Sequence, residues 1–599
     1  MEQKKARKAG IMDILRSPYA HRFFKKYKWS YLLGMAILIV IDSAQTEVPR
    51  IVGQVIDGIK YTTIDESGFA SAIVRMAVIA VLVLAGRIGW RYCIFGAARK
   101  IERDMRNDLF SHLNTLPVSY FHEHNAGEIM AYMTNDIEAV RMTFAATIMM
   151  GLDMITIGVT TLLKMIFQID FRLSFVTVIP LSMVAFVSMF VGREMHKRFT
   201  KRQEVFAKVS DFVQEKLSGI KVIKAFVQEE KEIAAFEAVN SESRTANIRD
   251  AKVQAFMFPF MHMIAGCSMA IAIAYGGYIA ILGRITVGDF SAFVQYLNML
   301  VWPIASIGRI INVVTRGSAS LKRVESVLHT ESDIKDALPE IATTEPVKGE
   351  IEARELTFRY PGTDRDVLKD ISFHIEPGQT LGIVGRTGAG KTTLVNLMLR
   401  IIDPDDDMLY IGGREIHTIP LQTLRASTGY VMQDNFLFSD TIRNNIAFGD
   451  HTKSFEEIQQ AAKMACVHDN IVDFPDGYET MVGERGVSLS GGQKQRISIA
   501  RALILDPEIL ILDDALSAVD TDTEEKILEN LKTLRHGKTN VIIAHRISTL
   551  QNADKIIVVD GSRIIEEGNH EELVAQGGMY ADLYRRQLLE KMKKEEYKL

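Results

Sequence analysis

Long stretches without charged residues restrict the fold of this chain more than any other feature. The clearest runs from Leu173 to Gly192 without one Asp, Glu, Lys or Arg. The stretches Val253–Gly283 and Phe290–Gly308 also lack these four residue types. A helix needs about 20 apolar residues to cross roughly 30 Å of hydrocarbon. Each stretch is long enough, so we predict that this part of the chain forms membrane-spanning α-helices.

Three less pure apolar stretches complete a set of six predicted passes. They cover about residues 29–49, 69–96 and 142–168. A charged side chain within such a stretch is expected to face protein, a water-filled cavity or an interface rather than lipid. The charged residues concerned are Asp42, Glu47, Arg75, Arg87, Asp153 and Lys164. We regard Asp42, Glu47 and Asp153 as candidates to line a substrate cavity, with structural pairing as the alternative for each.

The placement of Lys and Arg orients these passes. A basic segment at Arg22–Lys28 precedes the first pass, and two long charged stretches, Arg99–Arg141 and Arg193–Lys252, follow the second and fourth. Only short turns, near Asp170 and over Gly283–Gly288, follow the third and fifth. We therefore predict a multi-pass protein of the cell membrane with cytoplasmic N- and C-termini. Apolar residues at helical spacing predict that both long stretches are helical hairpins.

The second half of the chain has a different composition. Residues 1–330 hold 39 Lys and Arg against 28 Asp and Glu, whereas the remainder holds 31 against 46. From Ile351 onward, short β-branched runs alternate with helical segments, which is typical of an α/β domain. We predict a transmembrane domain at 1–330, a linker at 331–349 and a nucleotide-binding domain at 350–599.

A phosphate-binding loop follows the strand predicted at 380–384. The segment GRTGAGKT is the pattern G-x4-G-K-[ST], placed between a strand and a helix. Its backbone N–H groups wrap phosphates, its lysine reaches the β- and γ-phosphates, and its last hydroxyl binds Mg²⁺. The pattern therefore predicts a site for ATP and Mg²⁺. The predicted ATP-binding residues of this loop are Gly385, Arg386, Thr387, Gly388, Ala389, Gly390, Lys391, Thr392 and Thr393.

Two further segments fit the same chemistry. The predicted strand Ile509–Leu512 ends in Asp513 and Asp514. An acid after four apolar residues is the second half of a phosphate-loop site, so we predict that Asp513 helps to hold Mg²⁺. The sequence LSGGQ precedes a predicted helix, and a helix N-terminus attracts anions. The residues of LSGGQ are Leu489, Ser490, Gly491, Gly492 and Gln493.

The order of these segments resembles the ATPase domain of ATP-binding cassette (ABC) transporters. The phosphate loop, Gln433 in GYVMQD, LSGGQ, ILILDD, SAVD at 517–520 and His545 in IIAHR occur in that family's order. Fusion after six passes resembles an exporter half-transporter. The resemblance implies an α-helical six-pass transmembrane domain with long cytoplasmic hairpins, fused to an α/β P-loop ATPase domain.

The resemblance also implies roles for matching residues. Tyr360 would stack on adenine, Gln433 would sense the metal and the attacking water, and His545 would contact the γ-phosphate. The metal-binding set would be Thr392, Gln433 and Asp513. The signature residues LSGGQ would close on ATP held by a second subunit, because this family places two ATPs between two cassettes.

The hairpins carry the resemblance as well. It extends over YFHEHNAGEIM at 120–130 and LSGIKVIKAF at 217–226. In this family such segments pass motion between the ATPase and membrane domains. Tyr120–Gly127 and Gln214–Ile220 would be the two coupling helices.

One position departs from the family pattern. An active cassette presents Glu after the metal-binding Asp as the general base, whereas this chain has Asp514. The Asp carboxylate lies about 1.5 Å farther back because one methylene is missing, and a general base depends on hydrogen-bond reach. One interpretation is a tolerated substitution in a homodimer, and the other is a degenerate site in one half of a heterodimer. ILDDALSAVD and Tyr296–Val324 resemble the degenerate-site half of heterodimeric bacterial multidrug exporters, which favours the second.

These features predict ATP-driven export of amphipathic compounds or drugs by alternating access. The expected partners are a second half-transporter, the lipid bilayer and an amphipathic small molecule. No nucleic-acid partner is expected, because the membrane passes exclude a soluble DNA-repair or translation ATPase. The alternatives are a homodimeric exporter of lipid, peptide or another substrate, and a nucleotide-gated channel or regulatory subunit.

Overall fold

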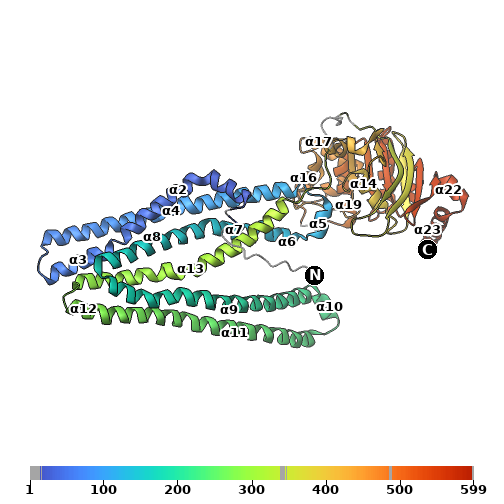
Figure 1. The fold of residues 1–599 in the computed structure, drawn as a ribbon. Coiled ribbons are helices and arrows are strands. Elements are labelled where there is room, and N and C mark those ends of the chain that lie inside the picture. Colours follow the sequence, from blue (N-terminus) through green and yellow to red (C-terminus); the bar gives the residue numbers. More distant parts are fainter. Residues whose placement is uncertain (1–13, 15, 337–344, 346, 484–488, 597–599) are drawn as a thin grey trace. The chain divides into compact units, whose positions relative to one another are not determined.

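The computed structural model of the chain describes residues 14, 16–336, 345, 347–483 and 489–596 (Figure 1). The chain forms two compact units. One unit lies within residues 1–115 and 124–330, and the other combines 116–123 with 331–599. The predicted linker at 331–349 falls partly outside the described residues, at 337–344 and 346.

Long helices build the first unit (Figure 1). Single π-helical turns continue a helix at Tyr132–Asp136, Thr143–Thr147, Met165–Ile169 and Ala272–Gly276. The helices are α2 Pro18–Gln45, α3 Val48–Lys60, α4 Glu66–Leu113, α6 Ala126–Ala131, α7 Ile137–Met142, α8 Ile148–Lys164, α9 Phe171–Ser218, α10 Ile220–Ala225, α11 Glu229–Ile271, α12 Gly277–Ile281 and α13 Val287–Leu328.

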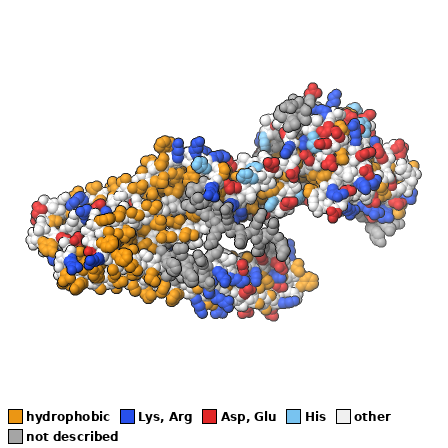
Figure 2. Space-filling model, viewed as in Figure 1, with side chains coloured by type: hydrophobic (Ala, Val, Ile, Leu, Met, Phe, Trp, Pro, Cys, Tyr) orange, Lys and Arg blue, Asp and Glu red, His pale blue; other side chains and the backbone are white. Residues whose placement is uncertain are grey.

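Five of the six predicted passes are found as long apolar helical stretches among the described residues. The stretches are Pro18–Lys60, Glu66–Leu113, Ala126–Ile169, His262–Ile281 and Val287–Leu328. The remaining pass lies in α9, whose described apolar segment, Phe171–Met183, is shorter. The side chains of the following residues, 184–196, lie outside the described set. Hydrophobic side chains cover much of the visible face of these helices (Figure 2).

The predicted turns and hairpins are present. Asp170 caps α9 by accepting a hydrogen bond from the Leu173 N–H at 2.7 Å, directly after the preceding helix ends. The helices α9 and α11 lie side by side (Figure 1), and the Arg202 guanidinium of α9 donates to buried Asp250 of α11 at 2.7 Å. The short helix between them is α10, so the predicted coupling segment Gln214–Ile220 ends where this helix begins.

The other predicted coupling segment, Tyr120–Gly127, covers the end of one short helix and the start of the next. The first of these is α5, Val118–Glu123, and the second is α6. Helix α5 lies in the stretch 116–123 that belongs to the second compact unit.

The second unit is built on two sheets. One is antiparallel in the order β2-β1-β4-β5. The other has the order β10-β9-β3-β8-β7-β6, in which β10 is an antiparallel edge and the rest are parallel. The strands are β1 Ile351–Phe358, β2 Leu368–Ile375, β3 Thr380–Gly385, β4 Leu409–Ile411, β5 Arg414–Glu415, β6 Thr428–Val431, β7 Ile509–Asp513, β8 Thr539–Ile543, β9 Lys555–Asp560 and β10 Arg563–Gly568.

Helices cover the parallel sheet on both faces. All residues of β7 and β8 are buried, and alternate residues of β7 enter two different apolar clusters. Leu510 and Leu512 belong to one cluster, whereas Ile509 and Ile511 belong to the other. The helices are α14 Lys391–Met398, α15 Leu421–Ala426, α16 Ile442–Ile446, α17 Phe455–Met464, α18 His468–Val472, α19 Gly491–Leu503, α20 Thr521–Leu534, α21 Ile547–Leu550, α22 His570–Gln576 and α23 Met579–Glu596.

A buried arginine joins the end of α20 to the starts of β7 and β8. The Arg535 guanidinium donates to the Asn540 Oδ1 at 3.0 Å, to the Pro507 carbonyl at 2.9 Å and to the Thr539 carbonyl at 3.4 Å. Burial lowers the pKa of Arg535 to about 10. This side chain therefore supplies donors to three oxygen acceptors at buried positions.

We expect Arg535→Met to destabilise the second unit by about 3 kcal/mol, because three buried acceptors lose their donor. The measurement is calorimetric unfolding of the purified chain. The control is Arg585→Met, since the Arg585 side chain is 67% exposed and surface changes stay within about 0.5 kcal/mol. Equal unfolding temperatures of the two variants would contradict this role of Arg535.

Candidate nucleotide-binding site

The predicted phosphate loop lies between β3 and α14. Gly388 and Gly390 have φ angles of +79° and +97°, in the left-handed region that favours glycine. A Cβ atom on Gly390 would lie 2.8 Å from the Val367 carbonyl oxygen. Glycine is therefore required at 390 by both conformation and space. The turn it makes directs the N-terminal N–H groups of α14 toward the loop, where they attract anions.

Lys391, the first residue of α14, is held inside this loop. Its Nζ donates to the carbonyl oxygens of Gly385 at 2.9 Å and Arg386 at 3.0 Å, and the side chain is buried. Burial lowers the pKa of Lys391, while the carboxylates of Asp513 and Asp514 oppose this shift. A buried cation whose acceptors are neutral carbonyls gains a stronger partner when a phosphate enters the loop.

The predicted metal ligands Thr392 and Asp513 lie together. Asp513 ends β7 and is 1% exposed. Burial raises the pKa of Asp513, whereas a hydrogen bond from the Thr392 side chain and the charge of Lys391 act in the opposite direction. The Asp513 Oδ2 atom has no hydrogen-bond partner among the described residues. A carboxylate oxygen without a donor beside a hydroxyl fits the oxygen ligands that Mg²⁺ prefers.

Gln433, the third predicted metal ligand, lies after β6, which pairs with β7. The Gln433 side chain is exposed. The main-chain carbonyl oxygen of Gln433, not its side chain, accepts a hydrogen bond from the Asn435 side chain at 3.4 Å. The amide group is therefore not buried in the fold, and it follows the strand adjacent to the one that carries Asp513.

Asp514 occupies a constrained backbone position. Its φ is +49°, a conformation that non-glycine residues adopt at a cost of about 1–2 kcal/mol. The Asp514 N–H donates to the Ile543 carbonyl at 3.0 Å, and its carbonyl accepts from the Ser517 hydroxyl at 2.9 Å. The half-buried side chain lines a cavity of about 100 Å³ together with His545.

The remaining predicted residues of the same site are Tyr360 and His545. The Tyr360 hydroxyl shares a hydrogen bond of 3.1 Å with the Thr393 hydroxyl, and its ring packs edge-on against Phe358. His545 follows β8, and its side chain is exposed. A positive charge on His545 lowers the pKa of Asp513. The structure thus places the loop, Asp513, Asp514 and His545 at the carboxyl ends of β3, β7 and β8, where parallel sheets bind ligands.

The LSGGQ segment forms the start of α19. Ser490 caps this helix: its Oγ accepts from the Gln493 N–H at 3.3 Å, and the Gln493 Oε1 accepts from the Ser490 N–H at 2.9 Å. Leu489 is buried, whereas Ser490 and Gly491 are exposed. The cap uses Ser490 Oγ only as an acceptor, so its hydroxyl proton remains available to an anion at this helix end.

Comparisons with known proteins agree with this geometry. Residues 31–304 match the family model described as "ABC transporter transmembrane region", and 368–517 match "ABC transporter". The chain is 39% identical to the probable multidrug resistance ABC transporter ATP-binding/permease protein YheI of Bacillus subtilis, over 95% of this chain and 97% of the relative. The chain belongs to the ABC transporter family.

Two further similarities identify its type. The multidrug resistance-like ATP-binding protein MdlA of Escherichia coli is 38% identical, over 95% of this ABC transporter and 96% of MdlA. A bacterial Atm1-family ABC exporter with ATP bound has a TM-score of 0.78 and 25% identity, covering 93% of this chain and 98% of that one. These results confirm the predicted fold and an ATP-hydrolysing transporter. The chain is an ATP-driven membrane exporter, and ABC exporters function as dimers.

Two side chains that hold the segment after Asp514 are not among the predicted site residues. The buried Gln495 Oε1 accepts from the Ala518 N–H at 2.8 Å, and its Nε2 donates to the Ser517 Oγ at 3.1 Å. The Arg546 guanidinium donates to the carbonyls of Ser517 and Val519. The sequence signal for these residues is their position: Gln495 is the second residue after LSGGQ, and Arg546 is the last residue of IIAHR.

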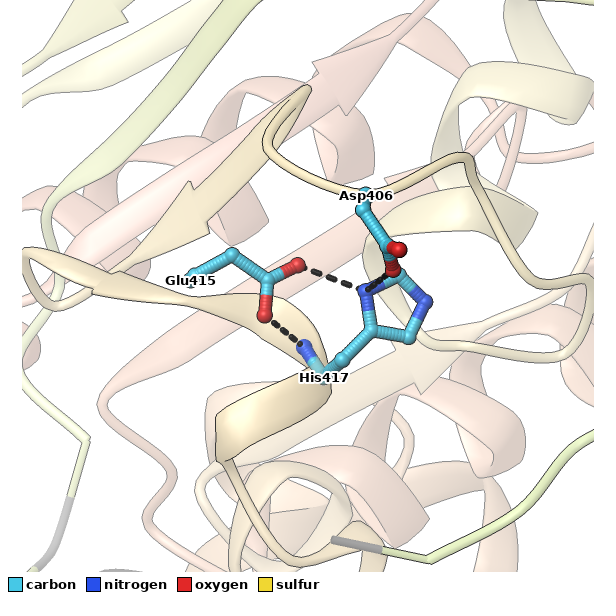
Figure 3. Close-up of side chains that lie close together, drawn as sticks. All are labelled: Asp406, Glu415 and His417. Carbon is cyan, nitrogen blue, oxygen red and sulfur yellow. Dashed lines mark hydrogen bonds and ion pairs between the residues drawn. The ribbon is translucent and has the colours of Figure 1, made fainter. Parts of the chain in front are cut away.

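A second polar cluster of the ATPase unit lies outside the nucleotide motifs (Figure 3). The His417 Nδ1 lies 2.6 Å from the Glu415 Oε1 and 3.5 Å from Asp406, and Glu415 also accepts from the His417 N–H. The Asp406 side chain is 92% exposed. We assign these contacts to the turn that they cap rather than to a metal site.

The contacts of Gln495 lead to a test of the link between the signature helix and Asp514. Gln495→Leu removes two hydrogen bonds to the segment 517–518, each worth about 1 kcal/mol. We expect the ATPase turnover of the assembled transporter to fall about tenfold, while ATP affinity changes little because Gln495 does not touch the phosphate loop.

Gln495→Glu is the matched variant for this test. It keeps the acceptor for the Ala518 N–H, so its turnover should lie between those of the wild type and Gln495→Leu. Gln576→Leu, at an exposed position, controls for the change in polarity. If Gln495→Leu turned over ATP at the wild-type rate, the link would have no role in hydrolysis.

Proposed function

We propose that this chain exports amphipathic compounds, including drugs, across the cell membrane as the degenerate-site half of a heterodimer. The observation that carries the heterodimer is Asp514 and its fixed backbone. Its N–H is bonded to Ile543 and its carbonyl to Ser517, so the main chain cannot move forward without breaking these bonds. The side chain therefore falls short of a glutamate by about 1.5 Å.

This shortfall weakens hydrolysis more than it weakens binding. A misplacement of about 1 Å can reduce a catalysed rate 100-fold, because the reacting groups must lie within hydrogen-bond reach. Among the described residues, the side chains proposed for ATP binding form no hydrogen bond with the Asp514 carboxylate, and a glutamate there would carry the same charge. Lys391 and the loop N–H groups bind the phosphates, and Tyr360 stacks on adenine. The chain thus retains ATP while hydrolysing it slowly at its own site.

Mg²⁺ fits the oxygen set at this site. Thr392, Gln433 and Asp513 would hold the ion, and Asp513 offers a carboxylate oxygen that has no hydrogen-bond partner among the described residues. When bound, the ion neutralises charge on the β- and γ-phosphates. His545 supplies a side chain toward the γ-phosphate, and Asp514 orients water poorly.

The signature residues of this chain complete the other ATP site of the dimer. The Ser490 hydroxyl and the N-terminal N–H groups of α19 offer donors to the γ-phosphate of ATP held by the second subunit. That subunit supplies the glutamate that this chain lacks. The heterodimer therefore has one competent and one degenerate site, and this chain contributes to both.

Export follows from the difference between nucleotide states. ATP stabilises the closed pair of cassettes because it binds the closed state more tightly than the open one, and a ligand shifts an equilibrium only by binding its states unequally. The helical hairpins transmit this closure to the membrane domain. In this arrangement both hairpins and both termini lie in the cytoplasm. The proposed domain limits are 1–330, 331–349 and 350–599, and the proposed coupling helices are Tyr120–Gly127 and Gln214–Ile220. The multidrug names of the bacterial relatives support the substrate class.

The test is ATPase activity of the purified chain without a partner. We expect weak activity, and we expect Asp514→Glu to raise it by roughly 10- to 100-fold, because the added methylene restores reach to the attacking water. Asp514→Asn should not raise it, since an amide is a poor base. Lys391→Ala in the Asp514→Glu background should abolish the gain and so localise it to this site.

The oligomeric state is measured in the same samples. A defined homodimer of the wild-type chain with brisk, substrate-stimulated ATPase activity would overturn the heterodimer proposal. It would favour the homodimeric exporter instead. Substrate-stimulated turnover that appears only after a glutamate-bearing half-transporter is added would support the heterodimer.

A further inference from the structure

The structure separates the three acidic residues of the first and third membrane passes. Glu47 accepts a hydrogen bond from the Lys164 ammonium at 2.7 Å, and Lys164 also donates to the Thr46 hydroxyl at 2.9 Å. This pair balances its own charge. Of the two interpretations left open by the sequence, structural pairing therefore describes Glu47. Asp42 and Asp153 have a different environment.

Asp42 of α2 and Asp153 of α8 lie near each other, and neither forms an ion pair among the described residues. Asp42 is 4% exposed, and its Oδ2 has no hydrogen-bond partner among the described residues. The same holds for the Oδ1 of half-buried Asp153. Helices α2 and α8 pack against each other, and the charge of the Asp153 carboxyl group acts on Asp42. Thr156 lies beside Asp42, but its hydroxyl proton is donated to the Leu152 carbonyl.

The charges around this pair do not cancel. Arg87 of α4 acts electrostatically on both carboxyl groups, and its exposed guanidinium donates to the Gln45 side chain at 3.3 Å. Two carboxylates and one guanidinium leave a single negative charge, to which the neutral Glu47–Lys164 pair adds nothing. Two carboxylates in such proximity do not both stay ionised without a compensating positive charge. An intramembrane charge of this kind marks a functional site more often than a structural one.

We propose that the Asp42–Asp153 pair binds one unit of positive charge, either a proton or the cationic group of a transported compound. The charge count decides the class of ligand: a monovalent cation neutralises the site, whereas a divalent ion would overcharge it. The two unpartnered carboxylate oxygens are the acceptors for a proton or an ammonium group. That the cation belongs to a transported compound rests on the proposed export function. Binding of a cation at the pair itself requires neither ATP nor a second subunit.

The test uses tetraphenylphosphonium, a monovalent cation without an ionisable proton, and the full-length chain in nanodiscs without nucleotide. Equilibrium dialysis measures its affinity between pH 5 and pH 8. Because protons compete for the same carboxylates, we expect binding to weaken as the pH falls. Asp42→Asn and Asp153→Asn should each reduce the affinity at least tenfold and remove its pH dependence.

The controls separate charge from folding. Asp42→Glu keeps the charge and should retain pH-dependent binding, and Glu47→Gln should do the same because Glu47 lies outside the pair. In a second arm, infrared spectroscopy follows the carbonyl band of a protonated carboxyl group. A band lost in Asp42→Asn, without binding of tetraphenylphosphonium, would assign the proton as the ligand.

The proposal is overturned if neither arm responds to Asp42→Asn or Asp153→Asn while both variants elute as the wild-type chain does. This failure would leave the export proposal standing, because no ATPase activity or partner enters the assay. Conversely, a chain that proved to be an active homodimer would still be expected to bind one positive charge at this pair.

Discussion

The parallel pairing of β3, β8 and β7 determines where the chemistry of this exporter takes place. Ile383 lies opposite Ile543, and Ile543 lies opposite Asp513. Strands in this register end at the same edge, so the phosphate loop after β3, the acids after β7 and His545 after β8 meet there. Because both faces of these strands are covered, a register shift of one residue would exchange the side chains that pack in the two apolar clusters.

Burial in a medium of low dielectric constant strengthens the interactions between charged groups in both units of the protein. In the ATPase unit, Lys391 and Asp513 are both buried, and the charge of each opposes the shift that burial causes in the pKa of the other. A phosphate adds negative charge, which the loop attracts. In the membrane unit, Glu47 and Lys164 neutralise each other, whereas Asp42 and Asp153 do not. Sites that carry an unbalanced charge are the sites that gain most from binding a ligand of the opposite sign.

The sequence predicted the class of each half because two of its signals are local. Apolar length follows from membrane thickness, and a phosphate loop needs its glycines, lysine and threonine in fixed order within eight residues. Five passes and the loop were found where expected. The short helix α10 begins only at Ile220, because chain reversal depends on how α9 and α11 pack rather than on residue spacing.

Contacts between distant residues could not be predicted in this way. Gln495 reaches Ser517 and Ala518 only because α19 packs beside the end of β7, and no spacing rule joins these positions. Asp42, Glu47 and Asp153 are equivalent as acids in apolar stretches. They differ because Lys164 of α8 forms an ion pair with Glu47, which follows α2. Asp42 and Asp153 form no ion pair among the described residues.

The backbone at Asp514 is compatible with the proposed degenerate site, because it leaves the rest of the ATPase unit undisturbed. Its left-handed conformation is set by the bonds to Ile543 and Ser517, which use main-chain atoms and a neighbouring hydroxyl rather than the Asp514 carboxylate. These main-chain contacts do not involve the side chain of residue 514, so a change in its length does not remove them. The signature helix, tied to the same segment through Gln495, is equally independent of that length. In the proposed heterodimer, one methylene group would therefore separate catalytic reach at this chain's site from signature function at the second site.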